Sequence, residues 1–235
     1  MRRSALCGFV LAAALAWSGR AEAREHLELA AALAPIVLQD AGYEAFSEGD
    51  LAQPRFGADV RYEAASFARG LRLVPLIAYR VGYDQGEPFD EIDTRLFVHD
   101  FLAGLRLRGW LLPWLGLFVE ARGGLLYARV HGEVEDLGGP GVRERYEDDL
   151  LTWSAGGLGG IETRISPRWL ARRGVRHFGF GAEISAGYLR RGNTEVSPEL
   201  KGGDDNSLPL AQTAKWGTLN LSGWSIQTAV VFSFR

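Results

Sequence analysis

The sequence has a single cysteine, Cys7, and no apolar run long enough to form a transmembrane helix. Cys7 lies in the apolar segment 5–17, which follows the basic start "MRR" and precedes the small-x-small sequence "AEA" at 21–23. This layout is typical of a secretory signal peptide, so we expect residues 1–23 to be removed. The mature chain, residues 24–235, then has no cysteine. Disulfides are excluded, and the fold must be stabilised by burial and backbone pairing.

Basic residues are also fewer than acidic ones. The full chain has 26 basic and 29 acidic residues, for a net charge of −3. The predicted signal peptide contains three arginines and one glutamate, so the net charge of the mature chain is −5. This balance gives no reason to expect a nucleic-acid partner. Without a transmembrane helix, the mature chain could cross a membrane only as strands.

Alternation of apolar and polar residues recurs along the mature chain. In "RFGADVRYEA" (55–64), Phe56, Val60 and Tyr62 share one face, whereas the charged residues share the other. This period of two indicates β-strands, because a helix repeats every 3.6 residues. Eight segments follow the pattern: 27–37, 55–64, 71–83, 97–108, 117–127, 152–164, 177–188 and 216–234. The sequence therefore predicts an all-β fold of eight strands.

The connections between these segments alternate in length. Those near 66–70, 109–114 and 166–174 are short. The others are mostly longer and acidic, and they lie near 39–53, 84–93, 131–149 and 190–214. Short turns at one end and long polar loops at the other are typical of an antiparallel up-and-down transmembrane β-barrel. Ten strands would follow instead if the 131–149 segment contained an additional hairpin.

Aromatic residues lie near the expected strand ends. Tryptophan and tyrosine favour the boundary between membrane and water because they combine an apolar ring with a polar edge. Two interface girdles are predicted, one at the short turns and one toward the loops. Their members are Trp110, Trp114, Trp169, Tyr127, Trp153, Tyr188 and Phe234.

Taken together, the signal peptide, eight alternating strands, loop asymmetry and aromatic-rich final strand "SIQTAVVFSFR" (225–235) resemble the small eight-stranded outer-membrane barrels of Gram-negative bacteria. The OmpA and OmpX barrels are the type cases. The resemblance implies an outer-membrane location, with lipid, lipopolysaccharide and the barrel-insertion machinery as partners. In that family the terminal residue is usually aromatic, whereas here Arg235 follows Phe234. A closed barrel would also pair the last strand with the first.

In the membrane orientation the charged face lines the lumen. Its expected residues are Arg55, Asp59, Arg61, Glu63, Arg72, Arg80, Asp100, Arg106, Glu120, Arg122, Glu162, Arg164 and Glu183. An eight-stranded barrel is only wide enough for side chains to fill, so we expect these charges to pair and plug the lumen. That favours a structural or surface-interaction protein. The alternatives are a narrow porin-like solute channel, a surface enzyme, and a soluble lipocalin-like barrel whose apolar face would surround a ligand.

Catalytic, cofactor-binding and metal-binding residues are not predicted. Some barrels of this class are lipid A deacylases with a His-x-Ser pair, but no histidine here has a serine two residues later. The acidic stretches "YEDD" (146–149) and "GGDD" (202–205) offer the oxygen ligands that calcium prefers, without EF-hand spacing. Acidic loops are more often simply solvated, so no extracellular partner is assigned to them.

Overall fold

A computed structural model describes most of the strand-forming part of the chain. The described residues are 27–38, 43, 46, 52–67, 70–87, 92–135, 143–165, 178–202 and 217–234. The predicted signal peptide and Trp169 lie outside this set. Within it, no helix has the length and apolarity needed to cross a membrane.

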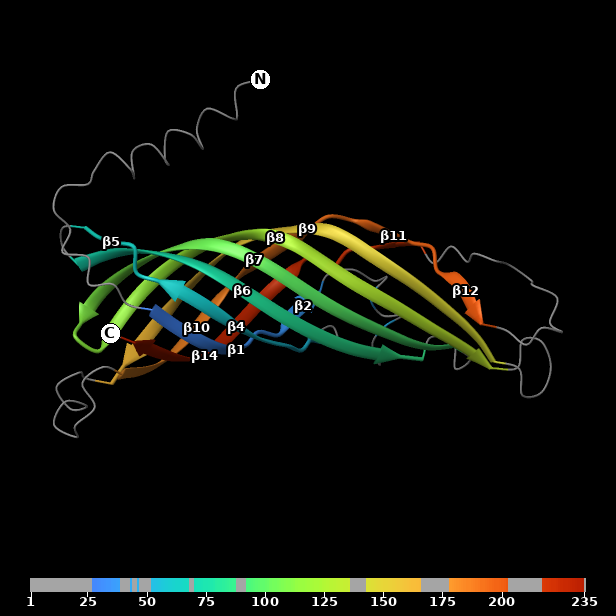
Figure 1. The fold of residues 1–235 in the computed structure, drawn as a ribbon, viewed down its shortest axis with the longest axis horizontal. Helices are drawn as coiled ribbons and strands as arrows, with labels where there is room; N and C mark the ends of the chain where they lie inside the picture. The colour runs from blue at the N-terminus through green and yellow to red at the C-terminus, as the bar shows by residue number, and fades with distance from the viewer. Residues whose placement is uncertain are drawn as a thin grey trace, which may run out of the picture.

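Eight strands form a closed antiparallel ring (Figure 1). In ring order they are β1 (Leu27–Leu33), β4 (Arg55–Tyr62), β6 (Leu71–Gly86), β7 (Ile92–Leu112), β8 (Leu115–Glu135), β9 (Arg143–Arg164), β10 (Phe178–Arg191) and β14 (Gly223–Phe234). Each pairs with the next, and β14 returns to β1 with Phe234 opposite Leu27. The eight-stranded up-and-down barrel is therefore confirmed. The last strand is regular to its end because both of its edges are paired.

Prolines divide the first two strands of the ring. After Pro35 the chain continues as β2 (Ile36–Leu38), which also pairs with β14. β3 (Ala52–Gln53) precedes β4 and is separated from it by Pro54. Proline cannot donate a ladder hydrogen bond, which explains both interruptions. Pro75 lies inside β6 opposite Leu105, as the alternation predicted.

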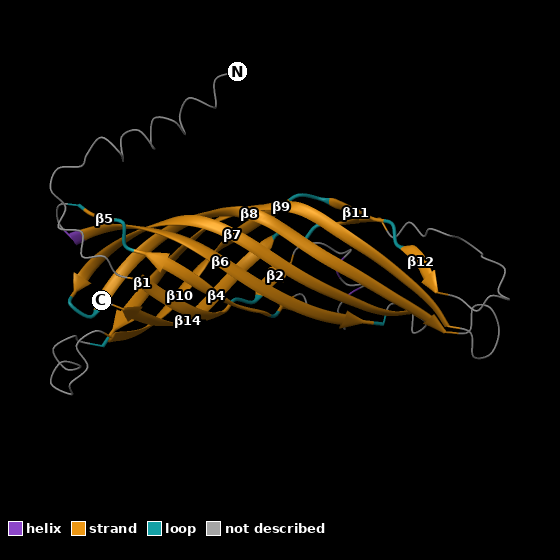
Figure 2. Ribbon diagram, in the orientation of Figure 1, coloured by secondary structure: helices purple, strands orange, loops and turns teal. Residues whose placement is uncertain are grey.

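One wall of the barrel is much longer than the rest. Strands β7, β8 and β9 have 21, 21 and 22 residues, whereas about 9–11 are enough to cross a bilayer. Most of the expected 131–149 loop therefore continues β8 and β9, and its described residues form no additional ring strand. β12 (Glu199–Gly202) pairs with β9 near the far end of this wall (Figure 2). Short β5 (Ala65–Ser66) pairs with β6, and β11 (Thr194–Val196) pairs with β13 (Gly217–Leu219).

The two faces of the barrel have opposite chemistry. On β14, Ile226 is 55% exposed whereas its neighbour Gln227 is 1% exposed. The same division holds around the ring, with Ile77, Val119 and other large apolar side chains outside and arginines and carboxylates inside. A lipocalin-like barrel would have the reverse arrangement, so that alternative is wrong. The outer face is suited to lipid and the inner face is not.

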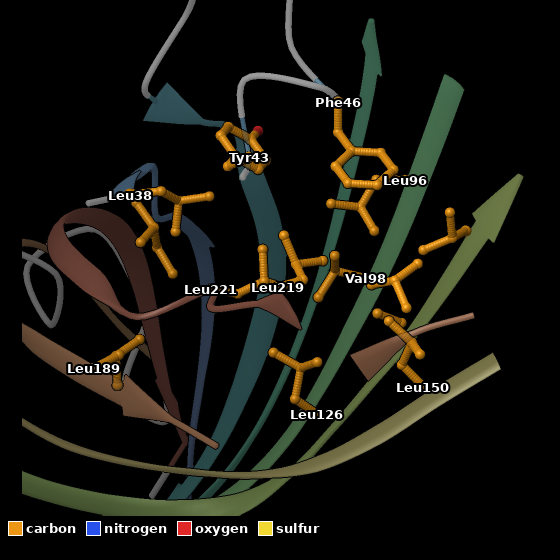
Figure 3. Packing of buried hydrophobic residues seen from close by; sticks show 14 residues of the cluster. Leu38, Tyr43, Phe46, Leu96, Val98, Leu126, Leu150, Leu189, Leu219 and Leu221 are labelled. Atoms are coloured by element: carbon orange, nitrogen blue, oxygen red, sulfur yellow. The ribbon is translucent and has the colours of Figure 1, made fainter. Parts of the chain in front are cut away.

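Apolar side chains fill the loop end of the barrel (Figure 3). Leu96, Leu126 and Leu150 extend inward from the long wall and are at most 5% exposed. Segments distant in the sequence cover them, and Tyr43 and Leu219 belong to this covering layer. We call this cluster the apolar cap. Its members are Ile36, Leu38, Tyr43, Phe46, Leu96, Val98, Leu126, Ala128, Val130, Leu150, Leu189, Val196, Leu219 and Leu221.

Candidate functional site: the charged lumen

The centre of the lumen is organised around Glu183 on β10. Its carboxylate accepts hydrogen bonds from Arg61 at 2.6 and 2.8 Å and from Arg106 at 2.8 Å. Arg61 also contacts Asp59 at 2.6 Å, and Arg106 contacts Glu120 at 2.8 Å. All five side chains are fully buried. These residues come from β4, β7, β8 and β10, and the two ion pairs of Glu183 connect β10 to β4 and β7, with which it shares no backbone ladder.

Further arginines extend this central network toward both sides. Arg80 lies 2.5 Å from Asp59, and Arg122 contacts Glu120 directly. Arg80 and Arg122 also each donate a 3.3 Å hydrogen bond to the same amide oxygen of Gln227. The Gln227 Nε2 atom is buried and has no hydrogen-bond partner among the described residues. Gln227 therefore places a neutral amide where two guanidinium groups converge.

The short-turn end of the lumen is closed by a second set of ion pairs. Arg108 binds Glu28 and Glu162, each at 2.7 Å. Arg164 contacts Glu28 directly and lies 2.5 Å from Glu162. The ring of Trp110 lies 4.9 Å from the Arg164 guanidinium carbon, on the lumen side of the barrel end. Because Glu162 lies 3.9 Å from Arg106, this set is continuous with the central network.

Under the apolar cap lies a separate group built on Asp100. Its carboxylate contacts Arg55 directly and Arg191 at 3.0 Å. Arg55 also donates a 2.9 Å hydrogen bond to Gln53, and Arg191 donates to the Leu221 carbonyl oxygen. All of these side chains are buried. The group joins the charged part of the lumen to the cap, because Leu221 belongs to the cap.

The lumen thus contains two groups: the central network, with its extension at the short-turn end, and the group on Asp100. Eleven of the thirteen residues assigned to the lumen from sequence lie in these two groups. The exceptions are Arg72 and Glu63, which pair with each other at 2.7 Å, with Arg72 30% exposed. Three members were absent from the assignment: Glu28, Arg108 and Arg191. Their positions within their strands carried the signal, since each has the parity of the inward-facing residues. Glu28, for example, alternates with the outward-facing Leu27 and Leu29.

The described lumen has more positive than negative charge. The central network contains six arginines (Arg61, Arg80, Arg106, Arg108, Arg122 and Arg164) and five carboxylates (Glu28, Asp59, Glu120, Glu162 and Glu183). The group on Asp100 contains two arginines and one carboxylate. Each group therefore has a surplus of one positive charge among the described residues. Buried charge without a partner is costly, so these surpluses mark the positions where a new carboxylate should be favourable.

Gln227→Glu tests this charge balance. We expect the substitution to raise the free energy of unfolding by about 1–2 kcal/mol, because hydrogen bonds to a charged acceptor are stronger than those to an amide. The measurement is the urea midpoint of the protein refolded in lipid vesicles at neutral pH. Gln85→Glu makes the same chemical change outside the two lumen groups and should leave the midpoint unchanged. A lower midpoint for Gln227→Glu would show that the central network is already neutralised.

The described aromatic residues assigned to the girdles lie at both barrel ends. Trp114 is 50% exposed at the short turns, and Phe234 lies 5.8 Å from Phe178 there. Toward the loops, Trp153 is 47% exposed and Tyr188 packs against Trp224 at 5.5 Å. Trp110 differs, because its ring lies against the lumen residue Arg164 as described above. We call the aromatic residues toward the loops the belt. His99 belongs to it, because its ring lies between those of Tyr79 and Tyr127.

Beyond this belt the outer face becomes charged. Asp149 accepts hydrogen bonds of 2.7 Å from both Arg129 Nε and the Tyr127 hydroxyl. The hydrogen bond from Arg129 holds the pKa of the Asp149 carboxyl below its ordinary value. Asp149 belongs to the "YEDD" stretch considered as a calcium site. Among the described residues, no group of three histidine or acidic side chains is placed to hold a metal ion.

A closed eight-stranded ring with apolar side chains outside and ion pairs inside defines a transmembrane β-barrel of the outer-membrane type. The exposed apolar side chains of the outer face are suited to lipid and not to water, whereas the charged side chains are enclosed in the lumen. The outer-membrane location expected from the sequence agrees with this architecture.

No family model matches the chain, and no curated protein matches its sequence. Solved structures with a similar arrangement include Neisserial surface protein A, at 14% identity and a TM-score of 0.39 over 88% of this chain and 95% of that one. The attachment invasion locus protein Ail of Yersinia pestis aligns at 11% identity and a TM-score of 0.41, over 89% and 97%. The Escherichia coli outer membrane protease OmpT aligns at 9% and 0.31, over 93% and 99%. At these values the similarity concerns the fold alone.

Proposed function

We propose that this protein is a non-catalytic, integral outer-membrane barrel with a closed lumen, serving a structural or surface-interaction role. The observation that supports it best is the filling of the lumen by two successive layers. Ion pairs occupy the short-turn end and the middle, and the apolar cap occupies the loop end. A solute would have to displace both layers. Arg191 links the two layers through a hydrogen bond to the Leu221 carbonyl oxygen.

The packing of the cap supports closure over the channel alternative. A gap bordered by Leu126, Leu150 and Leu219 has a volume of about 10 Å³, which is room for no more than one water molecule. Below it, Arg55, Arg61, Arg106 and Arg108 are at most 1% exposed. Neither layer resembles the aqueous path of a wide porin.

A non-catalytic role is favoured by the placement of the two histidines, His99 and His131, that the structure describes. His99 faces outward within the aromatic belt, where its Nδ1 lies 2.7 Å from the Tyr79 hydroxyl. His131 also lies on the outer face, beside Glu147. Among the residues that the structure describes, neither histidine contacts a serine or cysteine nucleophile. The partners that fit this protein are membrane lipid, lipopolysaccharide and the machinery that inserts barrels.

Planar-bilayer recording tests the closed lumen. We expect no stepwise conductance from the purified full-length mature protein in concentrated potassium chloride, because both layers exclude a continuous water path. A gel comparison of heated and unheated samples from the same preparation establishes that the protein is folded. Reproducible conductance steps from folded protein, with an ion preference that changes in Arg122→Glu, would instead establish the channel alternative.

A further inference from the structure

The long wall carries a groove on its outer face, above the membrane. The groove has a volume of about 350 Å³ and lies across β7, β8 and β9. Its charged lining residues are Asp93, Arg95, His131, Glu133, Arg145 and Glu147, and Phe97 borders it on the membrane side. These positions have the same parity as the lipid-facing residues Leu125 and Leu151 of the same wall. The groove therefore opens sideways, along the membrane, and is separate from the lumen.

The height of the groove can be obtained from the strands themselves. On each strand the charged lining residues lie four to eight positions beyond the belt residue of that strand, which is His99, Tyr127 or Trp153. With a rise of about 3.3 Å per residue and a tilt of about 40°, the groove stands about 10–20 Å above the belt. The headgroup layer of a phospholipid leaflet is only about 5–8 Å deep. A phospholipid headgroup would end below the groove.

The lining chemistry alternates between hydrogen-bond donors and acceptors. Arg95 lies 2.8 Å from Asp93 along β7, and His131 lies 3.4 Å from Glu147 across the β8–β9 ladder. Arg145 lies 3.9 Å from Glu133 and is 66% exposed. Because each base has an acid beside it, the groove has little net charge and many directed polar groups. That arrangement suits a ligand rich in hydroxyl groups, since each hydroxyl both donates and accepts.

We propose that this groove binds the sugar headgroup of an outer-leaflet glycolipid. The inference rests on the proposed function, because only an outer-membrane barrel places this surface beside such a lipid. Height selects a headgroup several sugars long, and the sideways opening selects a lipid neighbour over a soluble molecule. Phe97, at the lower border, adds an aromatic side chain to the lining, where it could contact the carbon face of a sugar. The lipid chains would then lie against the apolar band below the belt.

The test compares binding of two probes to the full-length mature protein in one detergent. We expect rough lipopolysaccharide, which carries inner-core sugars on lipid A, to bind at least about tenfold more tightly than lipid A alone. Arg95→Ala combined with Arg145→Ala should remove that preference, since both side chains are exposed donors on the groove. Arg190→Ala is the matched control, because Arg190 is an exposed, outward-facing arginine on β10, outside the groove.

Two results would overturn the proposal. One is equal affinity for rough lipopolysaccharide and lipid A. The other is a preference that survives the double substitution, or that Arg190→Ala removes equally. Failure of the proposed function would be seen separately, since a protein that is not a membrane barrel would show no difference between heated and unheated gel samples. The double variant must retain that difference, which shows that it is folded.

Discussion

Replacing Glu183 by alanine should lower the free energy of unfolding of the barrel by about 3–5 kcal/mol, because removing one partner leaves buried charge unpaired. Glu183 holds both Arg61 and Arg106, and its side chain has no exposed surface. Removing its carboxylate would raise the surplus of positive charge that the central network already has. The measurement is urea unfolding of the protein in lipid vesicles, followed by tryptophan fluorescence.

Two further variants are controls. One separates the charge of Glu183 from its volume, and the other tests whether loss of an exposed ion pair has the same effect on stability. Glu183→Gln keeps the size of the side chain, so a loss of stability close to that of Glu183→Ala would assign the effect to charge. Asp149→Ala removes an ion pair that is exposed on the outer face, where such pairs contribute little. It should leave the unfolding midpoint unchanged. If Glu183→Ala unfolded like Asp149→Ala, the lumen network would have no role in stability.

Val119→Arg should destabilise the barrel by about 2–4 kcal/mol, the cost of arginine on the lipid face near the bilayer midplane. Val119 is 59% exposed on the outer face of β8, between the short turns and the belt residue Tyr127. In water an arginine at such an exposed position would be tolerated. The size of the loss therefore measures directly what surrounds the outer face. Unfolding in vesicles of defined lipid composition gives the value.

Leu151→Arg is the matched substitution at the membrane boundary. Leu151 is 67% exposed and lies two positions beyond Trp153 toward the loops. The cost of arginine falls to about 0–1 kcal/mol near the interface, so the two variants should differ clearly. Equal and small effects at both positions would contradict a lipid-facing outer surface. Equal and large effects would place the membrane boundary higher on the long wall than the aromatic belt indicates.

Much of the architecture follows from local pattern. The alternation around Asp59 and Arg61 assigned both residues to the charged face, and the structure places both inside. The regular final strand predicted a partner, and β1 supplies it. Loop lengths were less accurate, because the charged outer positions of β8 and β9 beyond the membrane look like loop residues. Charged residues there are compatible with strands, since that part of the wall faces water.

The lumen shows where local pattern stops being informative. Period two assigns a residue to a face but says nothing about its partner across the bore. That Glu183 meets Arg61, 122 positions away, depends on the tilt and stagger of the strands around the ring. The apolar cap is a second example. Tyr43 and Phe46 come from a segment with no predicted strand, Leu219 comes from the last predicted strand, and only the folded barrel brings them over Leu126.

By itself the sequence determined the antiparallel up-and-down order of the strands and which residues share a face, because these depend on spacing between near neighbours. It left eight and ten strands both open, and the closed ring of the folded barrel decides for eight. The tertiary structure alone decided which charges pair, how the lumen is closed at the loop end and where a groove forms above the membrane. Those features depend on contacts between residues that are distant in the chain. Such contacts are set by the closure of the ring, whose geometry no short segment contains.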